Sequence, residues 1–419
     1  MTVPNHWHRR TLGDVARWGS GGTPAAGNKA FYGGRIPWAV IGDLNEGVVN
    51  TTAKTITQEG LEASSAKWVP EGAVLVAMYG SIGKLGIAGL AVATNQAIAF
   101  AVPGPEVDGK FLFYYLMSQR RRLEEVGKGA TQRNISQTLL RSWPIDLPQG
   151  LGEQRRIVEI LEDHLSHLDA ADRDLRVAEG RIDVLRLALL EVAIRPSEHW
   201  QALAVTDVTS GSRSDIAIGP FGSNLTTRDY CAAGVPLVFV RNVRTGNFDE
   251  GLKFVSRSKA NELASHIAHD GDVVMTKMGD PPGDTSVYRG EPAVITADVL
   301  RVRPSSAHDA DFVSMVLSGR ACRQQVLSIT SGVAQKKISL ARFRSTVTLR
   351  LPERPLQVAR RQAYRESCLA LDRQLGVILE ATSRSRSLRR RVLTAAFEGK
   401  LTGRDTDAEV IEEMADVQR

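Results

Sequence analysis

The chain has 419 residues, more than one ordinary domain core needs, and this length predicts two or three folded units. Hydrophobic residues (42%) and charged residues (24%) are balanced as in globular proteins, which excludes a largely disordered or fibrous chain. The formal net charge of +6 favours polyanionic partners without requiring them, because many basic proteins bind no nucleic acid.

The sequence gives no sign of export, a membrane span or a metal. Residues 1–10 contain no apolar run of the kind that a secretory signal needs, so we expect a cytoplasmic protein. The most apolar stretch, 85–102, is interrupted by glycines and by residues 94–96, and it predicts two short strands. The cysteines are too widely spaced for a disulfide framework or a zinc site, at Cys231, Cys322 and Cys368.

The first part of the chain, residues 1–150, predicts a mixed α/β domain. Residues 36–41 and 71–76 are apolar runs next to glycine turns and predict strands, as does the run 97–102. Residues 111–126 follow with the periodicity of a helix.

Residues 152–194 predict one long helix, without proline until Pro196. Its apolar positions alternate in steps of three and four, which indicates a heptad seam, and charged residues occupy the other faces. His164 lies on this seam. It could be a metal ligand, but a polar residue that fixes the register of a coiled coil is the more ordinary interpretation.

The second half repeats the first. His6 and Trp7 recur as His199 and Trp200, 193 residues later. The strand-like runs recur at 235–240, 270–275 and 299–303, and the helical pattern at 312–329. Segments 129–136 and 332–339, which follow the helical patterns, also match in residue type. A period near two hundred residues predicts duplicated domains rather than a solenoid.

A second long helix is predicted from Pro355 to Glu398, with Gly399 where a helix C-cap belongs. Its apolar positions match those of the first helix 203 residues earlier, but Gln374 and Ser385 interrupt its seam. A basic run, residues 384–391, fits either phosphate contacts or a protein-docking surface.

Helices of this length would be about 65 Å long, and an exposed apolar seam predicts that they pair with each other. Antiparallel pairing would carry two domains to opposite ends, related by a pseudo-two-fold axis, at a spacing suited to half-sites about one DNA turn apart. The predicted segments are domains 1–150 and 196–352, helices 151–195 and 353–402, and a tail 403–419. The predicted interface residues are Leu161, Leu168, Leu175, Ile182, Leu185, Leu189, Leu371, Ile378, Leu388 and Val392.

The order domain, helix, domain, helix resembles the specificity subunits of type I restriction-modification enzymes over nearly the whole chain. The motifs that carry the resemblance are residues 20–24 (SGGTP), 79–84 (YGSIGK), 94–96 (TNQ), 129–136 (GATQRNIS) and 395–401 (AAFEGKL). The second domain departs from the pattern, because residues 279–283 (GDPPG) replace the Gly-x-x-Gly-Lys loop.

The resemblance implies that each domain reads a few base pairs of double-stranded DNA. It also implies two methyltransferase subunits docked on the helices and flipping adenines, with motor-nuclease subunits for cleavage. AdoMet, ATP and Mg²⁺ are then expected on those partner subunits, and this chain is expected to bind no cofactor and to be no enzyme.

Two other classes of function stay open on the residues alone. A self-sufficient DNA modification enzyme is disfavoured, because residues 80–84 are too short for a phosphate-binding Walker loop, and Asp280-Pro281-Pro282 lacks the aromatic residue of amino-methyltransferases. A coiled-coil adaptor that ignores DNA is disfavoured by two domain copies with diverged loops.

Loop residues with long donor side chains are the candidates for DNA contact, since Arg and Lys suit guanine and Asn and Gln suit adenine. About half or more of such contacts go to phosphate and sugar instead, so the regions are predicted more firmly than single residues. The candidates are Lys84, Lys128, Gln132, Arg133 and Asn134 in the first half, and Arg241, Asn242, Arg244, Lys277, Lys336 and Lys337 in the second.

Overall fold

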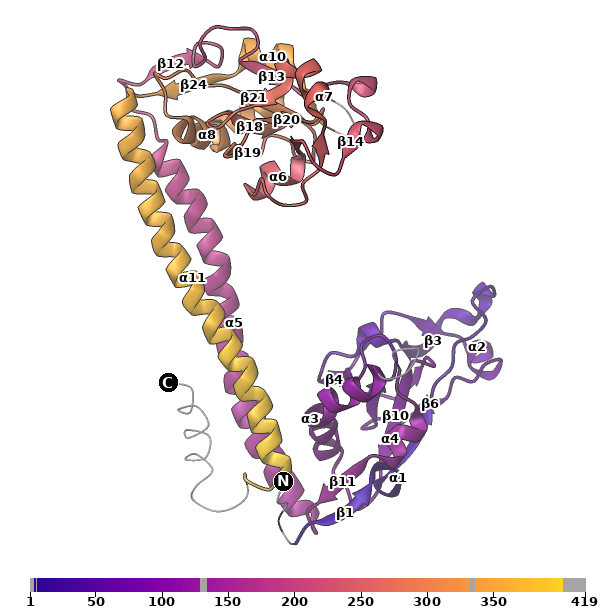
Figure 1. Ribbon diagram of the computed structural model, residues 1–419. Coiled ribbons are helices and arrows are strands. Elements are labelled where there is room, and N and C mark those ends of the chain that lie inside the picture. Colours follow the sequence, from indigo (N-terminus) through magenta and orange to yellow (C-terminus); the bar gives the residue numbers. More distant parts are fainter. Residues whose placement is uncertain (1–3, 5, 129–133, 332–335, 402–419) are drawn as a thin grey trace. The chain divides into compact units, whose positions relative to one another are not determined.

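The computed structural model describes residues 4, 6–128, 134–331 and 336–401 (Figure 1). The chain forms two compact units, one comprising Met1–Arg176 with Leu379–Arg419 and the other Val177–Ile378. Each unit contains a head of sheets and short helices together with part of both long helices, which are therefore shared between the units. The heads have the predicted mixed α/β content.

The head of the first unit contains two main sheets. One has the strand order β2-β10-β7-β8-β4, with bounds Ala16–Ser20, Ile98–Pro103, Val74–Ala77, Leu85–Ala88 and Val48–Val49. The other has the order β5-β3-β9-β6, with bounds Thr55–Ile56, Tyr32–Ala39, Val92–Thr94 and Trp68–Val69. Strands β1 (His8–Thr11) and β11 (Pro144–Leu147) form an antiparallel pair. The α-helices are α1 (Leu12–Val15), α2 (Gln58–Glu62), α3 (Gly109–Lys128) and α4 (Gln137–Ser142).

The head of the second unit repeats this plan. Its first sheet has the order β13-β21-β18-β19, with bounds Ile216–Ile218, Val299–Val302, Val273–Thr276 and Thr285–Val287. Its second has the order β14-β16-β15-β20-β17, with bounds Tyr230–Cys231, Phe254–Val255, Val235–Val238, Ala293–Ile295 and Ile267–Ala268. The smaller pairs are β12 (Gln201–Ala204) with β24 (Thr348–Leu351), and β22 (Thr330–Ser331) with β23 (Lys337–Ile338). The α-helices are α6 (Val240–Thr245), α7 (Arg257–Glu262), α8 (Ala310–Ser318), α9 (Arg320–Ser328) and α10 (Leu340–Thr346).

One predicted helix is broken. The pattern over residues 312–329 predicted a single helix, whereas the structure has α8 and α9 with Gly319 between them. A Cβ at Gly319 would lie 2.1 Å from Cδ1 of Ile194, a residue just beyond the end of the first long helix. The break therefore lies where the long helix approaches the head too closely for a side chain.

The repeated tryptophans close the two cores in the same way. Trp7 packs edge-on against Phe111, with ring centroids 6.5 Å apart, and Trp200 packs edge-on against Phe312 at 5.9 Å. All four side chains are buried. The repeated sequence pair thus marks a repeated packing contact in each head.

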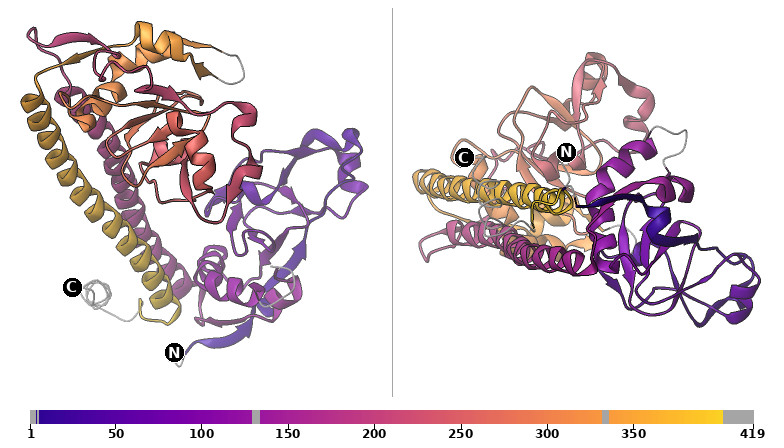
Figure 2. Two further views of the ribbon diagram at one scale, coloured as in Figure 1. Left: turned by 45° about the horizontal axis from the view of Figure 1, so that its top comes forward. Right: turned by 90° about the horizontal axis from the view of Figure 1, so that it is seen from below.

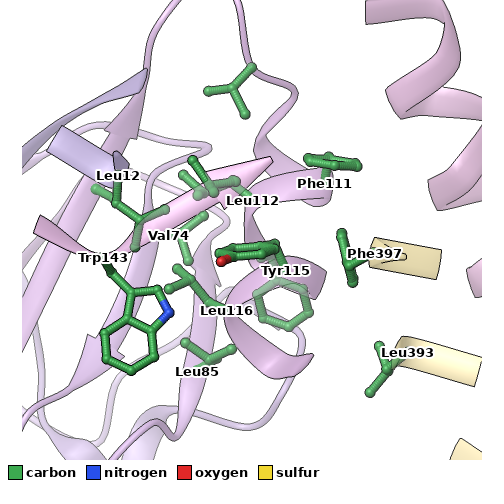
Figure 3. Close-up of a cluster of buried hydrophobic side chains, with 14 of the residues drawn as sticks. Leu12, Val74, Leu85, Phe111, Leu112, Tyr115, Leu116, Trp143, Leu393 and Phe397 are labelled. Atoms are coloured by element: carbon green, nitrogen blue, oxygen red, sulfur yellow. The ribbon is translucent and has the colours of Figure 1, made fainter. Parts of the chain in front are cut away.

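The end of α11 (Arg354–Phe397) completes the core of the first head (Figure 3). Phe397 packs edge-on against Phe111 and Tyr115, with ring centroids 5.1 and 5.4 Å apart, and Leu393 belongs to the same buried cluster. The motif AAFEGKL is therefore a packing element that joins the second long helix to the first head.

A buried glutamine near the start of each long helix ties that helix to its head. In α5 (Leu151–Ala193), Gln154 accepts a hydrogen bond from the backbone of Asp108 (2.8 Å) and donates one to the carbonyl of Glu106 (2.9 Å). Gln357 in α11 accepts from the backbone of Asp309 (2.8 Å) in the same manner. Both glutamine side chains are fully buried.

The second head also buries a carboxylate between two arginines. Asp272 accepts two hydrogen bonds from Arg303, at 2.8 and 2.7 Å, and lies 3.8 Å from Nε of Arg301. Asp272 and Arg301 are each 2% exposed. Removing one partner of such a buried ion pair strongly destabilises the fold, because the other charge is left buried without a partner.

The long helices run antiparallel within each unit (Figures 1 and 2). In the first unit, Leu161 near the start of α5 belongs to the same buried cluster as Val392 near the end of α11. In the second unit, Arg186 near the end of α5 pairs with Asp372 of α11. Leu175, Leu189 and Ile378 are half-buried, Leu168 and Leu388 pack against the first core, and Ile182 and Leu371 are buried.

The predicted seam of α5 needs a correction in phase. Leu165 is buried in place of His164, and Arg186 is half-buried whereas Leu185, a predicted interface residue, is 46% exposed. Asp172 likewise lies inside and faces Arg389 at 3.8 Å. The predicted positions 161, 168, 175, 182 and 189 do lie on the seam. The seam that forms also contains charged residues, Asp172 and Arg186, whose partners lie on the other helix. Hydrophobic periodicity could not reveal those partners.

Candidate nucleic-acid interface

Four of the singled-out segments meet at one edge of the β2-β10-β7-β8 sheet in the first unit. Because neighbouring strands are antiparallel, the end of β2, the start of β10, the end of β7 and the start of β8 share that edge. Residues 20–24, 79–84, 94–96 and 134–136 are the segments that leave or enter the strands there or lie beside them.

The SGGTP segment lies directly against the TNQ segment. The amide of Gly22 donates to the carbonyl of Thr94 at 2.9 Å, and Thr23 donates to the side chain of Gln96. A Cβ at Gly21 would lie 1.9 Å from the Thr94 carbonyl oxygen, so this contact requires glycine. The two motifs form one loop layer at the sheet edge.

The YGSIGK hairpin loop lies beside the segment that follows α3. Tyr79 and Asn134 form an isolated β-bridge, and the amide of Ile135 donates to the carbonyl of Met78 at 3.0 Å. Gly80 and Gly83 have φ values of +64° and +73°, in the left-handed region that glycine adopts without strain. Segments more than fifty residues apart in sequence therefore form one surface.

The second unit builds the same edge from its own residues. Met278 and Lys337 form an isolated β-bridge, and the amide of Ile338 donates to the carbonyl of Lys277 at 3.0 Å. The position of Gly21 is taken by Gly219, where a Cβ would lie 2.1 Å from the carbonyl oxygen of Thr296. The duplicated scaffold thus presents two loop clusters of the same design.

The first-half candidates lie at this edge as far as the structure describes them. Lys84 is half-buried, and its Nζ donates to the carbonyl of Ile41 at 3.2 Å, while Asn134 is half-buried in the β-bridge. Gln132 and Arg133 lie outside the described residues, as does the side chain of Lys128, the last residue of α3.

Three of the second-half candidates also gather at the corresponding edge. Lys336 is exposed and pairs with Asp280 at 3.1 Å, and Lys337 is exposed in β23. Lys277 donates to the carbonyl of Ala297 at 3.2 Å. Burial lowers the pKa of Lys277 below its ordinary value, which marks it as the least solvated of these lysines.

Asn242 does not fit the predicted role in base contact. Its side chain is 2% exposed, it accepts a hydrogen bond from the amide of Phe239, and both amide hydrogens bind the carbonyls of Asn247 and Glu250. It holds the segment that follows α6 against that helix. Its neighbour Arg241 is exposed and lies over the ring of Phe239, 4.5 Å from the centroid.

Two exposed aromatic residues at these edges were not predicted as site residues. Tyr79 is 40% exposed in the first hairpin loop, and Phe221 is 64% exposed with Nζ of Lys277 4.8 Å from its ring centroid. Both stand beside a glycine, and Tyr79 lies in the motif 79–84, whereas the loop of Phe221 was not singled out from the sequence. An aromatic residue inside such a glycine loop was the signal that could have identified them.

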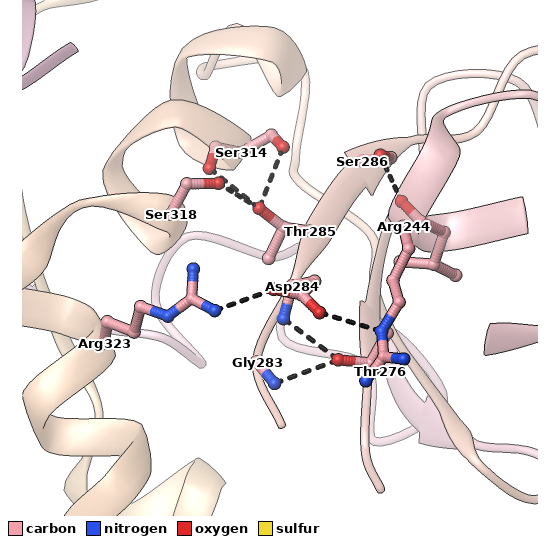
Figure 4. A network of polar contacts seen from close by, with 10 residues as sticks. Arg244, Thr276, Gly283, Asp284, Thr285, Ser286, Ser314, Ser318 and Arg323 are labelled. Carbon is pink, nitrogen blue, oxygen red and sulfur yellow. Dashed lines mark hydrogen bonds and ion pairs between the residues drawn. The ribbon is translucent and has the colours of Figure 1, made fainter. Parts of the chain in front are cut away.

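Arg244 is the remaining candidate, and it is part of an ion-pair network (Figure 4). Its Nε donates to Asp284 at 3.1 Å, and Asp284 also accepts from Nη2 of Arg323 at 2.7 Å. Arg244 comes from α6, Asp284 from the turn before β19, and Arg323 from α9. Three separate elements are thus joined by one carboxylate.

The basic run on α11 lines a cleft of about 1460 Å³ in the first unit. Arg390 and Arg391 line it from α11, and Arg121 lines it from α3. Arg389, also at the cleft, pairs with Asp169 of α5. One member of the run therefore stabilises the helix pair, and its neighbours line an open, cationic surface.

Other classes of site find no support in the described part of the chain. Among residues 4–401, without the undescribed gaps, no group of three or more His, Cys, Asp or Glu side chains could hold a metal ion. The three cysteines are free thiols, and burial raises the pKa of Cys322 to about 12. No helix within the described ranges is both long and apolar enough to cross a membrane.

Comparisons with known proteins agree with this architecture. Residues 4–174 match the family model of the type I restriction modification DNA specificity domain. The chain is 21% identical over 296 residues to the type I restriction enzyme MjaIX specificity subunit of Methanocaldococcus jannaschii, covering 66% of this chain and 67% of that protein. It is 22% identical over 401 residues to the EcoKI specificity subunit of Escherichia coli (strain K12), covering 88% of this chain and 82% of that protein.

The fold is shared with a solved structure. A chain reported under "Structural basis underlying complex assembly and conformational transition of the type I R-M system" superposes with a TM-score of 0.74 at 18% identity. The superposition covers 96% of this chain and 100% of the other.

Proposed function

We propose that this chain, a specificity subunit of the type I restriction-modification family, reads an asymmetric, split DNA site with one half-site at each of its two heads. The observation that carries the proposal is the convergence of corresponding loop segments at one sheet edge in each unit. Donor side chains from these loops suit base edges and phosphates, and the loops differ between the heads.

The chain itself performs no chemistry in this proposal. Methyltransferase subunits bind to its helices and methylate an adenine on each side, and motor-nuclease subunits join for cleavage. AdoMet, ATP and Mg²⁺ belong to these partners. Exposed aliphatic side chains support the docking role of the helices, since Val177, Val184 and Leu187 on α5 are 52%, 65% and 66% exposed.

The helix pair sets the spacing between the half-sites in this proposal. Support comes from the antiparallel contacts in each unit and from the buried glutamines, which tie the start of each helix to a head by paired hydrogen bonds. Spacing of a split site requires stiff connections of this kind.

Genome-wide mapping of methylated adenines, with and without this gene, tests the proposal. Deletion should remove one motif made of two unlike halves separated by unspecified bases. Loss of an unbroken palindrome would contradict the two-headed reading, and an unchanged methylation pattern would contradict the role in DNA modification.

A further inference from the structure

The network centred on Asp284 holds the edge of the second head (Figure 4). One carboxylate oxygen accepts from Arg244 and the other from Arg323, and the Asp284 side chain is 28% exposed. A carboxylate that accepts from two guanidiniums in a partly desolvated position makes charge-assisted hydrogen bonds, which are stronger than neutral ones.

The backbone around Asp284 is itself held in place. The amides of Gly283 and Asp284 both donate to the hydroxyl of Thr276, at 3.0 and 2.9 Å, and Thr276 is fully buried. Beyond it, Thr285 donates to the carbonyl of Ser314, and Ser286 donates to that of Val243, next to Arg244. The carboxylate therefore has a fixed position from which it can orient a neighbour.

Arg244 is the neighbour that this arrangement orients. Asp284 binds its Nε, and the two Nη groups make no hydrogen bond to any residue within the described ranges. The side chain is 46% exposed. Nη2 lies beside Gly279, at the strand end, where a Cβ would approach it to 2.7 Å. An arginine held through Nε keeps its Nη groups for a ligand, and such a guanidinium can bind O6 and N7 of guanine in the major groove.

The first head has a corresponding ion pair between a helix and a loop, in which the acidic residue comes from the loop and the arginine from the helix. Arg120, 203 residues before Arg323, donates its Nε to the carbonyl of Gly83 at 2.8 Å and pairs with Glu46. Glu46 lies in the loop after β3, which corresponds to the part of the second head that carries Arg244. In the first head, Arg120 therefore holds the hairpin loop and is itself paired with Glu46. Near the position that corresponds to Glu46, the second head carries Arg244 instead of an acidic residue.

We propose that Asp284 is a positioning residue that presents Arg244 to a guanine in the half-site read by the second head, with Arg323 securing Asp284. In the first head, the Glu46–Arg120 pair positions the hairpin loop 79–84, and the loop after β3 that carries Glu46 presents no arginine to the DNA. This inference rests on the proposed function. It goes further in naming the base, the residue that reads it and the residue that orients that reader.

Adenine methylomes of cells that express variant chains with their methyltransferase subunits test the inference. Arg244→Lys keeps the charge but loses the planar fork, and Asp284→Asn weakens the hold on Nε. Both should lower discrimination for guanine at one position of one half-site by at least tenfold and leave the other half-site intact. Glu46→Gln should change the other half-site.

Arg289→Gln is the matched control. Arg289 lies beyond the opposite end of β19 and pairs with Asp270 and Asp311, so this variant should keep the wild-type motif. Thermal unfolding of each purified chain, followed by circular dichroism, identifies a variant that fails to fold; if Asp284→Asn fails, Arg244→Lys decides the outcome.

Several results would overturn the inference. Unchanged guanine selectivity in Arg244→Lys would do so, as would a uniform loss of methylation at all sites, which indicates phosphate contact. Glu46→Gln acting on the same half-site as Asp284→Asn would refute the division between heads. If the wild-type chain specifies no split motif, the proposed function fails, and that result is distinct from all of these.

Discussion

Truncation of Phe397 should loosen the first head from the end of the second long helix. Phe397 is 9% exposed and makes two edge-to-face ring contacts, with Phe111 and Tyr115. Replacing a buried phenylalanine with alanine removes its transfer free energy and leaves a cavity, at a cost of about 3–5 kcal/mol. Each lost ring contact accounts for about 0.5–1.5 kcal/mol of geometry-dependent energy within that total.

The assay is urea unfolding of Phe397→Ala together with native-state hydrogen exchange of α3, whose side chains Phe111 and Tyr115 lose their partner. Leu369→Ala on the same helix is the control, because Leu369 is 56% exposed and its loss should change stability by less than about 0.5 kcal/mol. Equal destabilisation by the two variants, or unchanged exchange in α3, would show that the end of α11 is not part of this core.

Three further predictions concern stability and assembly. Asp272→Asn leaves two arginines beside an uncharged partner and should lower the free energy of unfolding of the second head by about 3–5 kcal/mol, measured in urea. The control is Asp270→Asn, at a carboxylate that is 65% exposed, which should change this free energy by less than about 1 kcal/mol. Similar values for the two variants would refute the argument from burial. Burial lowers the pKa of His308 below its ordinary 6.5, so the unfolded chain binds a proton more readily and stability should fall as pH drops below about 6.5. His308→Gln should flatten that fall, and an equally steep fall in both proteins would exclude His308 as its source. Val184→Asp with Leu187→Asp should reduce co-purification of methyltransferase subunits at least tenfold with an unchanged circular dichroism spectrum, and undiminished co-purification would exclude this face as the docking surface.

The sequence predicted the features of the fold that depend on local pattern. The duplication was visible in Trp7 and Trp200, which turned out to make the same buried ring contact in each core. The strands and the long helices were visible from periodicity, and the motif loops from glycine and proline. These signals are local or repeat along the chain, so they can be read without knowledge of contacts.

The remaining features depend on contacts between residues distant in sequence. The break at Gly319 lies against Ile194, which leaves no room for a side chain there, and the helix seam includes Asp172, opposite Arg389. Asn242 has the residue type of an adenine contact, but its hydrogen bonds are used between α6 and the residues on either side of that helix. Asp284 carried no signal in the sequence, because its role comes from two arginines on other elements.

The loop clusters at the sheet edges are largely separate from the residues that hold each head together. Core side chains such as Leu75 and Val274 lie along the strands, whereas Tyr79, Phe221 and Lys336 stand beyond the strand ends. Substitutions in the exposed loops thus leave the buried packing unchanged, and under the proposed function a lineage carrying this protein could acquire a new target sequence in small steps. The core that each head needs to fold would persist through every one of those steps.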